Sequence, residues 1–172
     1  ENVFTWADHT ICDEQYVVKV DPNIKKDVTA IIGCAVMTGA GAVINTAKVQ
    51  PGQSVVVFGV GGVGLSAVVG AKVAGANPII AVDLDDQKLE FAKAFGATHT
   101  INASVVDPIE AIHELTPQKG QFTISRQPVS GADFAFDCIG IRTTMEQIVP
   151  ACRGGYFGAN DGGTAVLVGV PS

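Results

Sequence analysis

A glycine-rich segment at residues 59–64, with the sequence GVGGVG, is the part of the chain with the clearest chemical meaning. It fits the spacing G-x-G-x-x-G, and an apolar run precedes it while a helical pattern follows it. In that context Gly59 permits a sharp turn, Gly61 leaves room for a pyrophosphate beside the backbone, and Gly64 lets the helix pack closely. The helix N-terminus at Gly62 and Val63 would offer unpaired N–H groups to the phosphates. The segment therefore predicts a dinucleotide site.

An acidic residue, Asp83, ends the next apolar run, about 20 residues after the last glycine, as the dinucleotide fingerprint requires. Asp83 would accept hydrogen bonds from the adenosine ribose hydroxyls. Its charge would repel a 2′-phosphate, which favours NAD over NADP. Lys88 could reach the same ribose, although a solvated helix face explains this lysine nearly as well. The alternative for Asp83 is that it and Asp85 only cap a helix that begins near Asp86.

Other nucleotide-binding loops fit less well. The segment lacks the Gly-Lys-Ser/Thr that a Walker-type phosphate loop requires. A methyltransferase fold also has a glycine-rich first loop and an acid after its second strand. Its loop usually follows an acidic strand end, whereas Phe58 ends this strand. A methyltransferase is therefore the weaker alternative.

Alternating strand and helix patterns would position these residues. The pattern predicts strands at 54–58, 79–83, 99–102, 134–138 and 165–170, and helices at 63–74, 86–95, 108–115 and 143–149. Such alternation is typical of a Rossmann-type, doubly wound parallel sheet of the α/β class. Residues 116–131 are polar and rich in Gly and Pro, which predicts a loop.

The first part of the chain has a different pattern. Residues 16–20 alternate weakly as a strand would, and Asp27 could cap a short helix that runs to residue 32. Residues 34–46 are rich in small side chains and predict a helix in which Gly39 and Gly41 allow close packing.

Composition excludes several classes of protein. Among 172 residues, 20 are glycine and only 16% are charged, while 47% are hydrophobic and the mean hydropathy is +0.33, so the chain can bury a core. A net charge of −6 excludes a basic nucleic-acid-binding patch. The uncharged run 55–71 has the hydropathy of a membrane span, but its glycines indicate strand, turn and buried helix, so no membrane is expected. Four widely spaced cysteines indicate reduced thiols in a cytoplasmic protein.

Several segments resemble the zinc-dependent alcohol dehydrogenases of the medium-chain dehydrogenase/reductase family. The matching segments are residues 33–43, 47–49, 57–66, 80–83, 95–98, 136–140 and 168–171. The resemblance implies that residues 1–33 are the end of a GroES-like catalytic domain and that 34–172 are an NAD-binding Rossmann domain without its last strand. We accordingly expect a piece of a longer protein, cut at both ends, whose uncovered apolar surface promotes self-association.

The resemblance also implies an activity and roles for individual residues. The parent protein would transfer hydride from an alcohol, or an aldehyde adduct, to NAD, with zinc as a Lewis acid, and would form a homo-oligomer. Cys34 falls on a zinc ligand and Thr38 on a nicotinamide contact, while Ile139, Val168 and Val170 fall on the nicotinamide pocket.

The match to the zinc ligands is incomplete. A catalytic zinc needs about three protein ligands, and Cys34 alone matches one, because His9, His99 and His113 fall elsewhere. The histidines at 99 and 113 are expected to be ordinary surface or edge residues. The chain as given is therefore expected to bind NAD but not zinc, and to be catalytically inactive. The alternative from a different class is a nucleotide-binding or regulatory module that has no catalytic role.

Overall fold

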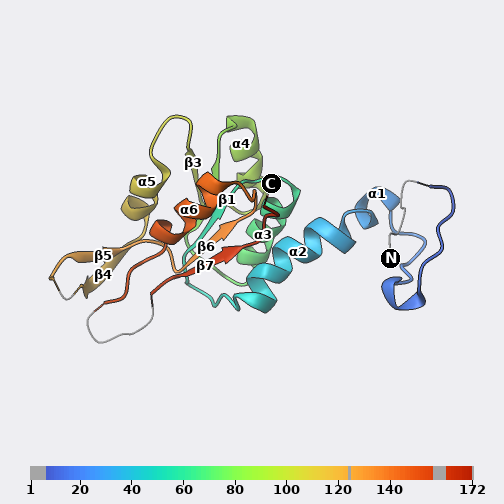
Figure 1. Cartoon of the computed structure of the whole chain (residues 1–172), viewed down its shortest axis with the longest axis horizontal. Coiled ribbons are helices and arrows are strands. Elements are labelled where there is room, and N and C mark those ends of the chain that lie inside the picture. The colour runs from blue at the N-terminus through green and yellow to red at the C-terminus, as the bar shows by residue number, and fades with distance from the viewer. Residues whose placement is uncertain (1–6, 124, 157–161, 172) are drawn as a thin grey trace.

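A parallel five-stranded sheet forms the centre of the computed structural model, which describes residues 7–123, 125–156 and 162–171 (Figure 1). The strands lie in the order β3-β2-β1-β6-β7. Their bounds are β1 Val55–Phe58, β2 Ile79–Asp83, β3 His99–Asn102, β6 Phe134–Asp137 and β7 Thr164–Leu167. The predicted Rossmann-type α/β class is confirmed, and the order reverses between β1 and β6, where the chain crosses to the other side of the sheet.

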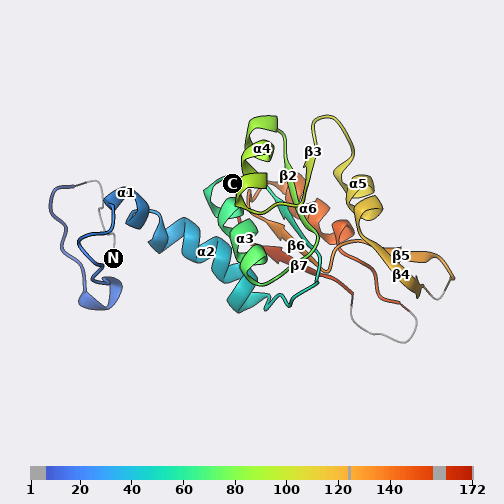
Figure 2. The same cartoon turned by 180° about the vertical axis from the view of Figure 1, so that it is seen from behind.

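Helices cover both faces of this sheet (Figure 2). One face packs against α3 (Gly62–Val73) and α4 (Asp86–Phe95), and the other against α5 (Pro108–Leu115) and α6 (Arg142–Ala151). Residues 55–58 of the central strand are all buried, because alternate side chains enter opposite cores. The low charge of the sequence follows from this arrangement.

A continuous helix, Lys26–Thr46, precedes the sheet and extends away from it toward the N-terminal segment (Figure 1). It comprises α1 (Lys26–Thr29) and α2 (Met37–Gly41), with π-helical turns at Ile32–Val36 and Ala42–Thr46. It has 21 residues, and an 18-residue window within it has a mean hydropathy of 1.8, so by length and composition alone it could cross a membrane. Within the part of the chain that the structure describes, no other helix meets both criteria. The run 55–71, in contrast, forms β1, the turn and most of α3, as predicted.

Gly39 is the residue that brings this helix close to α3. A Cβ at Gly39 would collide with the Val63 carbonyl oxygen and lie 2.8 Å from the Ala67 nitrogen. A Cβ at Gly41 would meet only the Asn45 side chain, 3.9 Å away. The predicted packing role is therefore confirmed for Gly39 and wrong for Gly41.

Three local predictions were wrong. Residues 116–131 contain an antiparallel hairpin of β4 (Pro117–Phe122) and β5 (Pro128–Ser130), whose strands pair with each other and lack apolar alternation. The segment 16–20 is not a strand, since its alternation has no neighbouring strand to pair with, and its first residue ends a 3₁₀ turn η1 (Glu14–Tyr16). Asp27 lies inside α1, where Lys25 holds the N-cap position.

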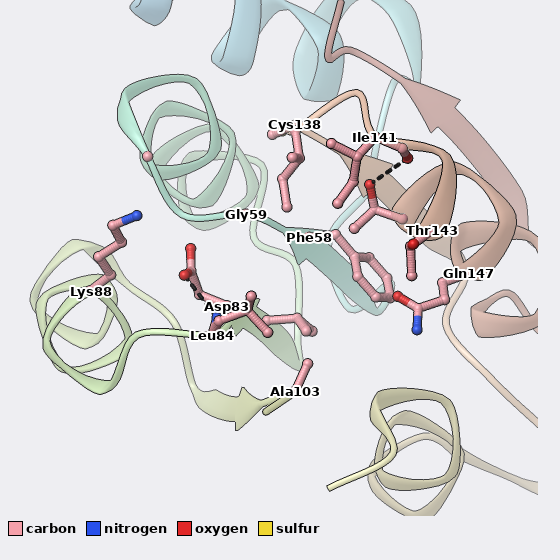
Figure 3. A pocket seen from close by; sticks show the side chains of 14 residues that line it. Phe58, Gly59, Asp83, Leu84, Lys88, Ala103, Cys138, Ile141, Thr143 and Gln147 are labelled. Carbon is pink, nitrogen blue, oxygen red and sulfur yellow. Dashed lines mark hydrogen bonds between the residues drawn. The ribbon is translucent and has the colours of Figure 1, made fainter. Parts of the chain in front are cut away.

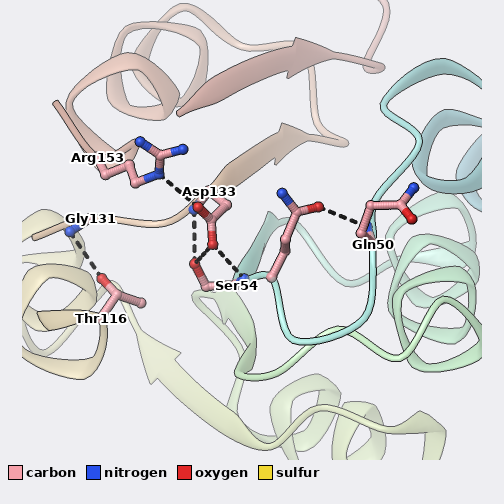
Figure 4. A network of polar contacts seen from close by, with 7 residues as sticks. Gln50, Ser54, Thr116, Gly131, Asp133 and Arg153 are labelled. Atoms are coloured by element: carbon pink, nitrogen blue, oxygen red, sulfur yellow. Dashed lines mark hydrogen bonds and ion pairs between the residues drawn. The ribbon is translucent and has the colours of Figure 1, made fainter. Parts of the chain in front are cut away.

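A polar network ties the sheet together at the edge where β1 and β6 begin (Figure 4). Asp133 Oδ2 accepts hydrogen bonds from Ser54 N (2.9 Å) and Ser54 Oγ (2.8 Å), and Arg153 Nε donates to Asp133 Oδ1 at 2.6 Å. Burial would raise the pKa of Asp133, but the hydrogen bonds from Ser54 and the Arg153 charge outweigh burial and lower this pKa. The network therefore favours the ionised carboxylate in the folded chain.

The Asp133 network is expected to make the free energy of unfolding depend on pH in the acidic range. Its contribution is complete above the unfolded pKa of about 3.9 and is lost as pH falls through the lower folded-state pKa. Asp133→Asn is expected to lower the free energy of unfolding by about 2 kcal/mol at pH 7 and to flatten this part of the pH dependence. Urea denaturation at pH 7 and at acidic pH measures both effects. Equal pH dependence in wild type and variant would refute the role of Asp133.

Candidate functional site

A pocket of about 560 Å³ opens at the carboxyl ends of β2, β1 and β6 (Figure 3). It lies where the strand order reverses, which is where open α/β sheets bind their ligands. Its lining comprises Phe58, Gly59, Gly61, Val82, Asp83, Leu84, Lys88, Ala103, Cys138, Ile139, Ile141, Thr143, Thr144 and Gln147. The fold thus brings together five residues predicted from the sequence: Gly59, Gly61, Asp83, Lys88 and Ile139.

The three glycines of the fingerprint differ in what a side chain at each position would meet. Gly59 has φ +83°, and a Cβ there would collide with the Ile139 side chain. A Cβ at Gly64 would collide with the Gly59 carbonyl oxygen, so this glycine seats the helix on the turn. Gly61, however, has an extended backbone (φ −74°, ψ −164°), and a Cβ there would meet nothing within 4 Å. Neither backbone nor packing requires glycine at 61, whereas a ligand lying on the turn would.

The N-terminus of α3 faces the same region. Gly61 is its N-cap residue and provides no side-chain cap, and the first turn contains no acidic side chain. Gly62 and Val63 lie in this first turn, where backbone N–H groups lack helical acceptors. Such a helix end favours an anion.

Asp83 is held by the backbone around it. Its Oδ2 accepts a hydrogen bond from Val60 N at 2.9 Å, and its Oδ1 accepts from Leu84 N (2.8 Å) and Asp85 N (3.2 Å). The cap of α4 is Asp85, whose Oδ1 accepts from Gln87 N at 2.8 Å. Asp83 therefore links the end of β2 to the glycine-rich turn, and its carboxylate, which has about four acceptor positions, retains capacity for a ligand.

The opposite wall of the pocket comes from the turn that follows β6 and from α6 (Figure 3). Sequence reasoning missed Thr143, Thr144 and Gln147 in this wall. The only available signal was that carboxyl ends of neighbouring parallel strands share one edge of the sheet.

Cys138 also lines this wall. Burial, with a smaller effect from the Asp137 charge, raises the pKa of the Cys138 thiol to about 12. This thiol is therefore protonated at neutral pH and is not a nucleophile.

The remaining predicted residues lie outside this pocket. Thr38 and Val168 line a second hollow of about 430 Å³ between α2 and the end of β7. Val170 is 83% exposed and lines neither hollow. His113 is more than an ordinary surface residue, since its ring nitrogens lie 2.6 Å from Ser130 Oγ and 2.8 Å from the Pro150 carbonyl oxygen.

Cys34, the predicted zinc ligand, is exposed on the long helix. Among residues 7–123, 125–156 and 162–171, no three His, Cys, Asp or Glu side chains are grouped so that they could hold a metal ion. A catalytic zinc takes about three protein ligands. The described residues therefore do not fit a zinc ion on their own.

Known proteins similar to this chain point to one family. The family model described as "Zinc-binding dehydrogenase" matches residues 62–172. The chain is 42% identical to an alcohol dehydrogenase class-3 of Cereibacter sphaeroides over 166 residues, and 39% identical to one of Oryza sativa subsp. japonica over 168. Each match covers 96% of this chain but only 42% and 39% of the respective relative.

Solved structures agree with this result. The crystal structure of benzyl alcohol dehydrogenase from Acinetobacter calcoaceticus is 40% identical, with a TM-score of 0.73, and the match covers 90% of this chain and 37% of that one. An alcohol dehydrogenase zinc-binding domain protein from Burkholderia ambifaria is 38% identical, also with a TM-score of 0.73, over 90% and 36% of the two chains. The chain belongs to the zinc-binding dehydrogenase family, and its resemblance to the zinc-dependent alcohol dehydrogenases of the medium-chain dehydrogenase/reductase family is confirmed.

Proposed function

We propose that this chain is the NAD-binding part of an NAD-dependent, zinc-type alcohol dehydrogenase that transfers hydride from an alcohol, or an aldehyde adduct, to NAD. The observation that carries the proposal concerns Gly61, which lines the pocket at the switch point of the sheet. Its backbone is extended and a Cβ there would meet no atom within 4 Å, so the space beside it is open to a ligand. The names of the relatives support the reaction class. Because the chain spans less than half of their length, the reaction is proposed for a protein that also contains the remaining regions.

In this proposal the chain's residues bind and orient the coenzyme, which supplies the hydride acceptor when bound. The N–H groups of Gly62 and Val63 face the pyrophosphate, and Gly61 allows it to lie against the turn. Asp83 accepts hydrogen bonds from the adenosine ribose, and its charge disfavours a 2′-phosphate. Lys88 lies in the same pocket and adds a cation near the ribose.

The nicotinamide end is assigned to the second hollow. Thr38 and Val168 line this hollow, whereas Ile139, which the resemblance places at the same end of the coenzyme, lines the first pocket. The proposed roles of Val170 in the nicotinamide pocket and of Cys34 as a zinc ligand rest on the resemblance alone. The described donors alone do not form a zinc site, so in this proposal Cys34 needs further ligands from outside the described residues.

Calorimetric titration with NAD, NADP and S-adenosylmethionine tests the proposal. We expect saturable binding of NAD, weaker binding of NADP and no binding of S-adenosylmethionine. Asp83→Ala is expected to weaken NAD binding by about tenfold to a hundredfold, since it removes a charged acceptor. It is also expected to reduce the preference for NAD over NADP.

Asp85→Ala is the matched control, because it removes a neighbouring carboxylate that caps α4 and does not line the pocket. It is expected to cost about 1 kcal/mol of stability and to leave NAD affinity unchanged. Unchanged NAD affinity in Asp83→Ala would contradict the ribose assignment. Preferential binding of S-adenosylmethionine would favour the methyltransferase alternative.

A further inference from the structure

A buried carboxylate stands behind the wall of the pocket. Asp137, the last residue of β6, is 0% exposed, yet it does not line the pocket. Its oxygens accept hydrogen bonds from Ile139 N at 3.0 Å, Gly140 N at 3.2 Å and Thr144 Oγ1 at 2.9 Å. A buried carboxyl group needs hydrogen-bond partners, and here the donors come from the turn after β6 and from the start of α6.

The turn that Asp137 holds, residues 138–140, is also constrained by other contacts. Gly140 has φ +89°, and a Cβ there would collide with the Val170 carbonyl oxygen. Cys138 N donates to the Phe58 carbonyl oxygen at 2.9 Å, which ties the turn to the end of β1. Ile139 packs so closely on Gly59 that a Cβ at Gly59 would collide with it. The conformation of residues 138–140 therefore sets how the wall meets the glycine-rich turn.

Thr144 connects this wall to α6. Its hydroxyl donates to Asp137 and also lies 3.1 Å from the Ile141 carbonyl oxygen, and the residue itself lines the pocket. A single hydrogen-bonded unit thus joins the end of β6, the turn and the first turn of α6. The turn and the first turn of α6 line the proposed coenzyme pocket, and the end of β6 lies behind them.

We propose that Asp137 and Thr144 are positioning residues for the coenzyme: together they hold the 138–141 turn so that Ile139 faces the glycine-rich turn before the ligand binds. This inference rests on the proposed function, because it assigns the pocket to NAD. These hydrogen bonds would preorganise the pocket, because a wall that is already ordered costs no ordering entropy when NAD binds.

The test compares the NAD affinity of variants that remove or keep the hydroxyl group of Thr144. Thr144→Val keeps the shape of the side chain and removes the donor, and we expect NAD binding to weaken by about tenfold. Thr144→Ser restores the hydroxyl and is expected to bind within about twofold of wild type. Equal affinity in wild type and Thr144→Val, or equal weakening in the valine and serine variants, would overturn the positioning role.

Thr116→Val is the control for a purely structural effect. Thr116 is also buried, and its hydroxyl accepts from Gly131 N at 3.1 Å and donates to the Ile112 carbonyl oxygen, at the opposite edge of the sheet. We expect it to lower thermal stability about as much as Thr144→Val while NAD affinity stays unchanged. A loss of NAD affinity equal to that of Thr144→Val would show that Thr144 acts through general stability.

Amide hydrogen exchange of the wild type gives a second measurement that does not depend on any variant's folding. The Ile139 and Gly140 amides are expected to be protected without NAD. Rapid exchange of both that slows only with NAD would overturn preorganisation. A wild-type chain that binds no NAD would overturn the proposed function, whereas normal NAD binding with an unprotected turn would overturn only the role of Asp137 and Thr144.

Discussion

Replacing Gly64 by alanine is expected to lower the free energy of unfolding by about 3 kcal/mol, the upper part of the usual range for overpacking. The added Cβ would collide with the Gly59 carbonyl oxygen and lie 2.9 Å from the Gly59 carbonyl carbon. Both atoms belong to the backbone of a turn that is itself constrained by Ile139, so neither can rotate away. The helix α3 must therefore shift from its seat on β1. Urea denaturation followed by circular dichroism measures the loss.

Gly62→Ala is the matched control for Gly64→Ala. A Cβ at Gly62 would make an ordinary contact with the Ala35 Cβ at 3.6 Å. Since alanine favours a helix over glycine, this variant is expected to be as stable as wild type or more stable by up to about 1 kcal/mol. If Gly64→Ala unfolds at the same urea concentration as wild type, the seating role of Gly64 is wrong.

Replacing Gly61 by valine is expected to have the opposite pattern, with an intact fold and a loss of NAD affinity of about a hundredfold or more. The extended backbone of Gly61 accepts a β-branched residue, and the space around its Cβ is empty in the chain alone. The side chain would then occupy the position where the pyrophosphate approaches the turn. Unfolding free energy should change by less than about 0.5 kcal/mol. Calorimetry and urea denaturation on the same sample measure both quantities.

Gly154→Val provides the comparison for Gly61→Val. A Cβ at Gly154 also meets nothing within 4 Å, but this residue lies outside the pocket. It is expected to leave NAD affinity unchanged. Equal NAD affinity in Gly61→Val and Gly154→Val would mean that the ligand does not lie on the glycine-rich turn.

Much of the fold could be predicted because local signals mark its elements. The helix Asp86–Phe95 was predicted with correct bounds, since Gly96 ends it with φ +127°. The helix Pro108–Leu115 was also correct, because the Asp107 carboxylate caps it and Pro108 begins it. Helical periodicity did not show which glycine faces α3. Gly39 and Gly41 lie two residues apart, about 200° around the helix axis, so only one can face a neighbour.

The missed features depend on contacts between distant segments. The hairpin β4–β5 pairs two polar segments with each other, so neither has the apolar alternation that marks a strand. Thr144 and Gln147 enter the pocket because β6 lies beside β1, and the strand order decides that. The glycine-rich turn and Asp83 could be predicted because they lie at the carboxyl ends of consecutive strands with a known spacing.

The central claim is that NAD binds on the glycine-rich turn at the switch point of the sheet. Titration of the isotopically labelled chain with NAD, followed by backbone amide NMR shifts, tests it most directly. We expect saturable shifts that are largest at Gly61, Gly62 and Val63, with Asp83 and Ile139 also affected. The absence of saturable shifts, or shifts confined to segments away from this pocket, such as the β4–β5 hairpin, would contradict binding at this turn.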